Sequence, residues 1–126
     1  MKLAWQQAAK TPGSAYGGVV VKDGKVVASD HHHVLEGPDL SAHAEMSAMR
    51  AANKALNSYS LKGCTLYSTY SPCEMCVAAA EWAGVDEIVY AKTKAEDPDP
   101  HEISKITIED YVKALGLKIK IRKFDS

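Results

Sequence analysis

The sequence is poor in net charge, in cysteine and in long apolar runs, and each scarcity excludes a class of protein. Lys and Arg number 15 and Asp and Glu number 16, so the net charge is −1 and there is no basic excess to hold a nucleic-acid backbone. No apolar run approaches the roughly 18 residues of a membrane span. The opening stretch MKLAWQQAAK lacks the apolar core of a signal peptide, so a cytoplasmic chain without membrane contact is expected.

Cysteine is scarce as well, with three residues in the chain. An odd, small number argues against a framework of disulfides. Two of the three, Cys73 and Cys76, form a C-x-x-C pair, which favours metal or redox chemistry.

What the sequence does have is the composition of one globular domain, predicted to span residues 1–126. Hydrophobic residues make up 46% and charged residues 25% of the chain, which is typical of a folded protein. At this length, folding buries roughly two thirds of the surface of the unfolded chain, enough for one core.

Local patterns predict alternating helices and strands. The dipeptide Asp23-Gly24 between two β-branched runs predicts an antiparallel hairpin. Ser71, Pro72 and Glu74 match a capping box at a helix start, and a strand on each side of that helix predicts a parallel pair. The predicted helices cover residues 2–10, 41–57, 72–83 and 107–115, and the predicted strands cover 17–21, 26–28, 65–70, 87–91 and 117–122. This order predicts an α/β fold, a three-layer α/β/α sandwich with a five-stranded mixed sheet.

Three side chains have the character of a zinc site. Cys73 and Cys76 are three residues apart at a predicted helix start, so their sulfurs lie within one turn. His43, at the start of another predicted helix, supplies a third ligand. Cys64 begins a strand that spans roughly 20 Å, which places it at the opposite edge of the sheet. Three protein ligands leave a fourth position open, as in catalytic zinc sites.

Glu45 stands beside this set without belonging to it. A carboxylate next to a bound metal can take a proton from water and hand it to a leaving group. The combination His43-Ala44-Glu45 with Pro72-Cys73-Glu74-Met75-Cys76 matches the signature H-x-E…P-C-x-x-C of zinc deaminases.

On these residues the sequence resembles the cytidine deaminase-like superfamily of zinc hydrolases. It is most similar to the branch of guanine deaminases, fungal-type cytosine deaminases and tRNA adenosine deaminases. The matching stretches are residues 17–28, 39–45 and 64–90, and the span 17–90 that encloses them is more than half of the chain. The resemblance implies Zn²⁺ held by His43, Cys73 and Cys76, with Glu45 as the catalytic proton shuttle, and a homodimer. It implies hydrolytic release of ammonia from an amino-substituted heterocycle, a guanine- or cytosine-like base.

The resemblance also indicates substrate-binding residues, and here the chain departs from the family. His32 stands where the family usually has an Asn that binds the base. Tyr16 takes the place of an aromatic residue under the base, and the backbone N–H of Ala44 is a further candidate. A C-terminal helical segment usual in this branch is missing from this sequence, which leaves a more open site or a lid supplied by residues 97–102.

Alternatives remain open at this stage. The near-neutral charge counts against a tRNA substrate, yet a tRNA or nucleoside adenosine deaminase is one alternative. A non-catalytic, zinc-stabilised binding module and a thiol oxidoreductase are the others. His31 and His33 are expected in a solvated loop, with an auxiliary metal site as the alternative reading. Trp82 is expected in the core or in dimer packing, Cys64 in the core, and the side chains of Lys118, Lys120 and Arg122 on the wet face of an edge strand.

Overall fold

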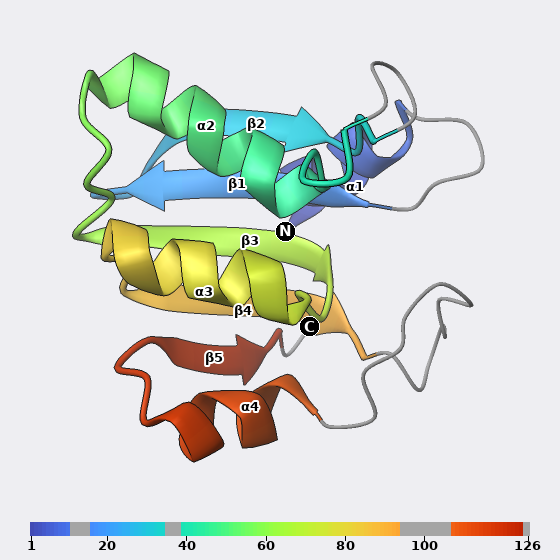
Figure 1. Cartoon of the computed structure of the whole chain (residues 1–126). Helices are drawn as coiled ribbons and strands as arrows, with labels where there is room; N and C mark the ends of the chain where they lie inside the picture. The colour runs from blue at the N-terminus through green and yellow to red at the C-terminus, as the bar shows by residue number, and fades with distance from the viewer. Residues whose placement is uncertain (11–15, 35–38, 94–106, 125–126) are drawn as a thin grey trace.

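The computed structural model describes residues 1–10, 16–34, 39–93 and 107–124 (Figure 1). In these residues the helices and strands follow the predicted order. The helices are α1 (Lys2–Ala8), α2 (Ala44–Leu56), α3 (Glu74–Ala83) and α4 (Ile108–Leu115), and the strands are β1 (Gly17–Lys22), β2 (Lys25–His31), β3 (Cys64–Tyr70), β4 (Glu87–Lys92) and β5 (Lys120–Lys123). None of the described helices has the length and apolar character needed to cross a membrane.

The five strands form one mixed sheet in the order β2-β1-β3-β4-β5. β1 pairs antiparallel with β2 and with β3, whereas β4 pairs parallel with β3 and with β5. Both sequence predictions of strand direction are therefore confirmed. The hairpin turns through Asp23 and Gly24, whose φ angles of 52° and 75° are the positive values that such a turn requires.

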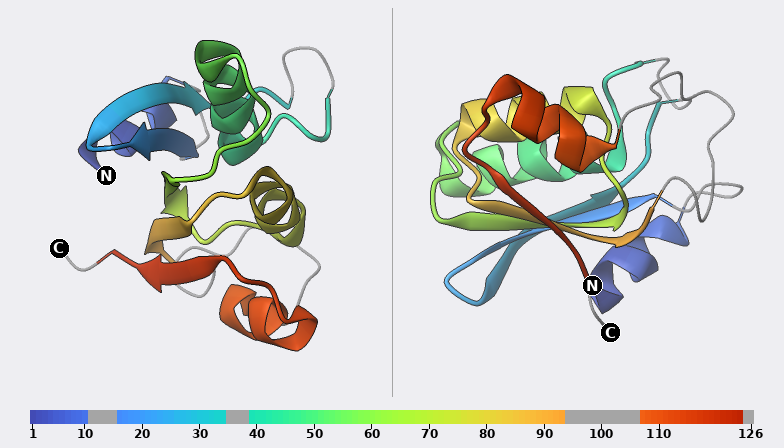
Figure 2. Two further views of the ribbon diagram at one scale, coloured as in Figure 1. Left: turned by 90° about the vertical axis from the view of Figure 1, so that its left-hand side faces the viewer. Right: turned by 90° about the horizontal axis from the view of Figure 1, so that it is seen from below.

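Helices cover both faces of this sheet, which confirms the predicted three-layer sandwich. Figure 2 shows α2, α3 and α4 on one face and α1 on the other. The core lies between the sheet and the three helices α2, α3 and α4. Its fully buried members include Val20, Leu66 and Ile88 from the strands and Ala48 and Val77 from the helices.

Two glycines at the start of β1 let helices approach the sheet from both sides. A Cβ atom on Gly17 would lie 1.9 Å from the carbonyl oxygen of Ala4 in α1. A Cβ atom on Gly18 would lie 2.9 Å from the carbonyl oxygen of Ala44 in α2. Because successive strand residues face opposite sides of the sheet, each glycine admits one helix. Gly18 thereby brings the N-terminal end of α2 against the sheet.

The start of α2 differs from the prediction. The helix begins at Ala44 instead of in the region of Ser41, and its N-cap is His43 in an extended conformation. Ser41 does not cap the helix, because its N–H and its hydroxyl both donate to Asp39 Oδ1, at 2.9 and 2.7 Å. Such a turn around an Asp side chain competes with helix capping.

The start of α3 also lies later than predicted. Its N-cap is Cys73, with φ −77° and ψ 170°, and Glu74 is its first residue. The predicted capping box with Ser71 is wrong, because the Ser71 N–H donates to the carbonyl oxygen of Lys92 at 2.8 Å and so continues the pairing of β3 with β4. The predicted cap of α4 is confirmed, since Thr107 Oγ1 accepts a hydrogen bond from the Asp110 N–H.

Smaller predictions have mixed outcomes. Trp82 is 88% exposed, which excludes the core and leaves dimer packing as the prediction for this residue, whereas Cys64 is fully buried as predicted. β5 begins at Lys120, three residues later than predicted, and α1 ends at Ala8, two residues earlier. Lys118, Lys120 and Arg122 are exposed at this edge strand, as expected. The loop of residues 97–102, proposed as a lid, lies outside the described residues.

Candidate active site

Three potential metal ligands meet where α2 and α3 begin, next to the end of β3. His43 is the N-cap of α2, Cys73 is the N-cap of α3, and Cys76 lies in the first turn of α3. The Sγ of Cys73 lies 3.5 Å from His43 Nδ1 and 3.6 Å from Cys76 Sγ, and Cys76 Sγ lies 3.8 Å from His43 Nδ1. The three ligand atoms therefore form a nearly regular triangle.

This triangle has the size of one face of a zinc tetrahedron. Zinc binds sulfur at about 2.3 Å and imidazole nitrogen at about 2.0 Å, so tetrahedral angles separate two sulfurs by about 3.8 Å and sulfur from nitrogen by about 3.5 Å. The ligand atoms of His43, Cys73 and Cys76 match these separations to within a few tenths of an ångström. Both the ligand types and their spacing therefore fit Zn²⁺.

The two sulfurs share one proton in the metal-free protein. The pKa of Cys73 is lowered to about 4, chiefly because the Cys76 thiol donates a hydrogen bond to the Cys73 thiolate, and His43 adds to this effect. The pKa of Cys76 is raised well above 9.0, because Cys73 holds its proton in place and because the group is buried. The positive end of the α3 dipole also favours a thiolate at this position.

Glu45 lies beside the triangle, in the second position of α2. Its side chain is 5% exposed, and its Oε2 lies 3.5 Å from Cys76 Sγ. Burial raises the pKa of this carboxyl above its ordinary value, and a hydrogen bond from Ser68 opposes the rise. A carboxyl whose pKa is raised toward neutrality is suited to giving and taking a proton.

Ser68 holds this carboxyl from the middle of β3. Its hydroxyl is fully buried and lies 2.5 Å from Glu45 Oε1 and 2.7 Å from the carbonyl oxygen of Tyr70. A hydroxyl has one proton and can also accept. It donates to Glu45 when the carboxyl is ionised, and when the carboxyl is protonated it accepts from Glu45 and donates to Tyr70. Ser68 therefore has a hydrogen-bonding arrangement for each protonation state of Glu45.

Ser68 was not predicted as a site residue, although a signal was present. Leu66 and Ser68 are two residues apart in β3 and share one face of the strand. Leu66 is fully buried, so a hydroxyl two positions further along is expected to be buried as well and to require a hydrogen-bonding partner.

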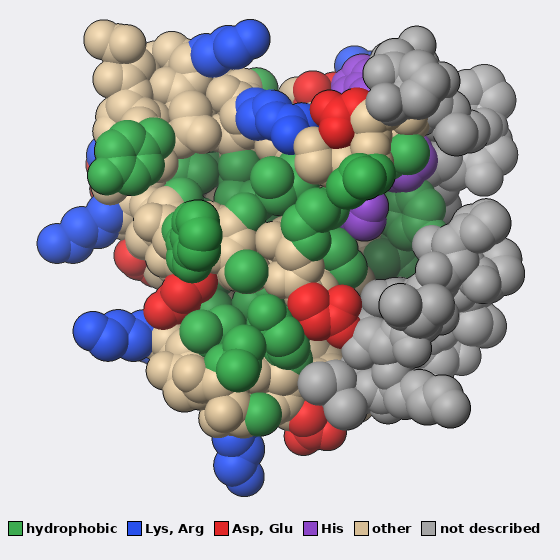
Figure 3. All heavy atoms as spheres, in the orientation of Figure 1, with side chains coloured by type: hydrophobic (Ala, Val, Ile, Leu, Met, Phe, Trp, Pro, Cys, Tyr) green, Lys and Arg blue, Asp and Glu red, His purple; other side chains and the backbone are tan. Residues whose placement is uncertain are grey.

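Of the three predicted substrate-binding residues, His32 and Ala44 lie beside His43, and Tyr16 lies beside His32. The ring of His32 lies 6.1 Å from that of His43 and 5.5 Å from that of Tyr16, and Tyr16 contacts Tyr70 edge to face at 5.3 Å. Ala44 is fully buried as the first residue of α2. Figure 3 shows histidine side chains at the surface on the side of the molecule where α2 and α3 begin.

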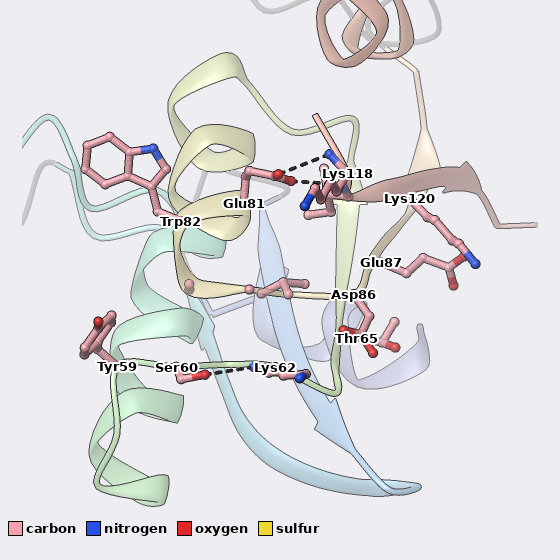
Figure 4. Close-up of a pocket in the computed structure, with 14 residues that line it drawn as sticks. Tyr59, Ser60, Lys62, Thr65, Glu81, Trp82, Asp86, Glu87, Lys118 and Lys120 are labelled. Carbon is pink, nitrogen blue, oxygen red and sulfur yellow. Dashed lines mark hydrogen bonds between the residues drawn. The ribbon is translucent and has the colours of Figure 1, made fainter. Parts of the chain in front are cut away.

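Cys64 lies away from this site, at the opposite end of β3, and is not part of the cluster formed by His43, Cys73 and Cys76. At that far end a groove of about 810 Å³ runs between the end of α3 and the start of β5 (Figure 4). No His or Cys is among its lining residues, and Glu81 spans part of it by accepting hydrogen bonds from the N–H groups of Lys118 and Ile119. The groove is therefore distinct from the site of the titratable cluster.

Fold and site together define an α/β/α sandwich with a three-ligand metal site at the carboxyl end of a central strand. Residues 1–92 match the family model described as the cytidine and deoxycytidylate deaminase zinc-binding region, and the chain belongs to this family. Zinc is thus the cofactor that the family implies, in agreement with the ligand types and spacing of the site.

Relatives in this family act on different substrates. The chain is 41% identical to guanine deaminase of Bacillus subtilis over 90 residues, which cover 71% of this chain and 56% of that protein. It is 37% identical to tRNA-specific adenosine deaminase of Aquifex aeolicus over 75 residues, which cover 60% of this chain and 50% of that protein. The chain therefore spans about half the length of these curated relatives.

Solved structures show the same division. One structure, from studies of A-to-I editing by tRNA deaminases at the wobble position, superposes with a TM-score of 0.82 at 28% identity, over 98% of this chain and 89% of that one. Guanine deaminase of Bacillus subtilis superposes with a TM-score of 0.71 at 27% identity, over 91% of this chain and 88% of that one. Both comparisons support the deaminase fold.

Proposed function

We propose that this chain is a zinc-dependent hydrolase that removes the amino group of a free, guanine- or cytosine-like base and releases ammonia. The observation that carries this proposal is the buried Glu45 carboxyl, which lies beside the triangle of His43, Cys73 and Cys76. A zinc site that is only structural does not require a buried carboxyl at this position. When bound, zinc lowers the pKa of water and so supplies the nucleophile for attack on the amino-bearing carbon.

Glu45 moves the protons in this proposal. It takes the two protons of the attacking water one after the other and delivers the first to the ring nitrogen and the second to the departing amine. Its raised pKa suits both halves of this task. Ser68 supports both forms of the carboxyl by donating to the ionised form and accepting from the protonated form.

The base binds, in this proposal, beside the rings of Tyr16 and His32 and near the first turn of α2. The two rings are 5.5 Å apart, and such an aromatic wall suits a planar heterocycle. His32 offers one nitrogen as donor and the other as acceptor, so it can read a ring edge. The N–H of Ala44 belongs to the first turn of α2, where N–H groups have no partner within the helix.

Ammonia release by the zinc-loaded chain tests the proposal. The substrates are guanine, cytosine, adenine, their nucleosides and a few amino-substituted pterin and triazine rings. Glu45→Gln, an isosteric variant without an ionisable group, is measured in parallel for activity and zinc content. Release from a free base that disappears in Glu45→Gln, with zinc retained, supports the proposal. Zinc binding without release from any substrate would favour a binding module instead.

A tRNA adenosine deaminase is the second candidate. The superposition with the structure from the tRNA-editing study, over 98% of this chain, favours it. The net charge of −1 opposes it, because tight RNA binding rests on basic residues. Conversion of adenosine to inosine in an anticodon stem-loop, with affinity that falls steeply as salt rises, would select this candidate over the free-base proposal.

The homodimer implied by the resemblance is part of the same proposal. Two large aromatic side chains, Tyr59 at 82% and Trp82 at 88% exposure, offer apolar surface near the end of α3. Sedimentation velocity of the chain tests this assembly. A mass that stays at 13.6 kDa over the accessible concentrations would exclude the dimer.

A further inference from the structure

A second group of metal-ligating side chains lies at the end of β2, formed by Asp30, His31 and His33. Their ligand atoms all lie within 4.8 Å of one another. His33 Nε2 lies 2.6 Å from Asp30 Oδ1, and the rings of His31 and His33 are 4.0 Å apart between centroids. The group shares no residue with the triangle of His43, Cys73 and Cys76.

The alternation of side chains along an extended chain explains this arrangement. His31 and His33 are two residues apart and lie ring against ring, whereas the ring of His32 lies near those of Tyr16 and His43. The backbone N–H of His31 donates to Asp30 Oδ1 at 2.8 Å and holds the carboxylate beside the two rings. The sequence HHH thus serves two sites, with its middle residue at one and its outer residues at the other.

Hydrogen bonds determine which nitrogen of His31 can bind a metal. Its Nδ1 lies 3.2 Å from the carbonyl oxygen of His32, which can only accept, so Nδ1 carries the proton. In the neutral ring the lone pair then belongs to Nε2. A ligating imidazole whose other nitrogen donates to a backbone carbonyl is the usual arrangement in metal sites.

We propose that Asp30, His31 and His33 form a second metal site that binds a divalent transition ion. Two imidazoles and one carboxylate suit Zn²⁺, Co²⁺, Ni²⁺ and Cu²⁺ and are poor ligands for Ca²⁺. The ion replaces the proton that His33 Nε2 donates to Asp30, and that proton leaves to solvent. Ligand atoms about 2 Å from a tetrahedral ion lie about 3.3 Å apart, so the His33–Asp30 contact opens by less than 1 Å.

The site is open to solvent and close to the proposed substrate pocket. The side chains of His33 and Asp30 are 28% and 30% exposed, so an ion can enter without disturbing the core. The His33 N–H donates to the carbonyl oxygen of Ala42, the residue before His43. An ion at this site therefore fixes the residues on both sides of His32.

Metal stoichiometry tests the proposal without reference to activity. The zinc-loaded chain is dialysed against buffered free Zn²⁺, and bound metal is counted by mass spectrometry. Wild type is expected to bind two ions per chain, and His31→Ala/His33→Ala is expected to bind one. His32→Asn, the matched control within the same tripeptide, retains both ions. Cys73→Ser loses the ion at the triangle and keeps the one at Asp30, His31 and His33.

Imidazole NMR spectra identify the ligands directly. Co²⁺ added to the chain that holds zinc at the triangle alone is expected to broaden the ring signals of His31 and His33 and to spare them in Asp30→Asn. All substituted side chains are partly exposed, and circular dichroism verifies that the variants fold. One ion per wild-type chain, or two ions in the double histidine variant, would overturn the second site. Neither result bears on the deaminase proposal, whose test is ammonia release.

Discussion

Removal of the Ser68 hydroxyl is the sharpest test of how Glu45 is held. Ser68→Ala deletes a fully buried group that lies 2.5 Å from Glu45 Oε1. The hydrogen bond stabilises the ionised carboxylate and lowers its pKa, so the variant is expected to raise the pKa of Glu45 further. The proposed proton shuttle then has less of its ionised form at neutral pH.

The size of the effect follows from the type of bond. A hydrogen bond to a charged group contributes about 1.5–3 kcal/mol, and 1.4 kcal/mol corresponds to a factor of ten. Loss of the bond is expected to lower kcat about ten- to hundredfold. KM is expected to change little, because Ser68 lies behind Glu45 and not at the rings of Tyr16 and His32.

The assay is ammonia release by the zinc-loaded variant, measured across pH with the base that wild type converts. The acidic limb of the kcat profile is expected to move to higher pH, and the ¹³C signal of the Glu45 carboxyl is expected to titrate at higher pH. Ser47→Ala removes another buried hydroxyl from α2 and is expected to leave both unchanged. A folded, zinc-loaded Ser68→Ala with wild-type kcat and an unmoved profile would refute the reasoning.

Three further predictions follow from the same structure. In the metal-free protein Cys73 is expected to react with iodoacetamide, with half-maximal ionisation near pH 4, whereas Cys64 is expected to react only at higher pH. Peptide mass spectrometry measures the labelling of each cysteine, and labelling of Cys73 that begins only near pH 9 contradicts the shared proton. Burial raises the pKa of Glu45, so ionisation of this carboxyl lowers the free energy of unfolding as pH rises above 4.5. Metal-free Glu45→Gln lacks this loss and is expected to gain stability relative to metal-free wild type as pH rises in urea unfolding; a pH-independent difference opposes this. Gly17→Ala places a Cβ atom 1.9 Å from the Ala4 carbonyl and is expected to lower the free energy of unfolding by about 1–3 kcal/mol, and unchanged urea unfolding would contradict that packing.

The sheet could be predicted from the sequence because its signals are local. Asp23-Gly24 requires a tight turn, and β-branched runs flank it. The cap of α4 could be predicted as well, since Thr107 meets the N–H of Asp110 within its own helix. In both places no distant residue competes with the local preference.

The helix starts at the candidate site could not be predicted in this way. Ser41 and Ser71 are better capping residues than His43 and Cys73. Ser41 instead donates to Asp39, and the Ser71 N–H donates to Lys92, which is 21 positions further along the chain. The two predicted metal ligands take the cap positions without a capping hydrogen bond from their side chains. The capping preference of serine therefore does not decide where α2 and α3 begin at the candidate site.

The motif residues of the site could be predicted from the sequence, but the hydrogen bond that Ser68 makes to Glu45 could not. The motif named Glu45, His43 and both cysteines, since their spacing is short within each fragment. The hydrogen bond from Ser68 to Glu45 joins residues 23 positions apart on different elements. Only the packing of α2 on β3 brings the two together, and no periodicity in the sequence encodes that pair.

The position of β3 has a consequence for the order in which the protein folds. β3 pairs with β1 on one side and with β4 on the other, and it separates the fragment that carries His43 from the one that carries Cys73. Cys73 and Cys76 can bind an ion in an unfolded chain, but His43 can bind the same ion only after this central strand has formed. Metal binding then follows the formation of the long-range strand pairs. It stabilises these pairs once they have formed and does not accelerate the earlier, slow step in which they form. Zinc added to refolding protein should slow unfolding more than it accelerates folding.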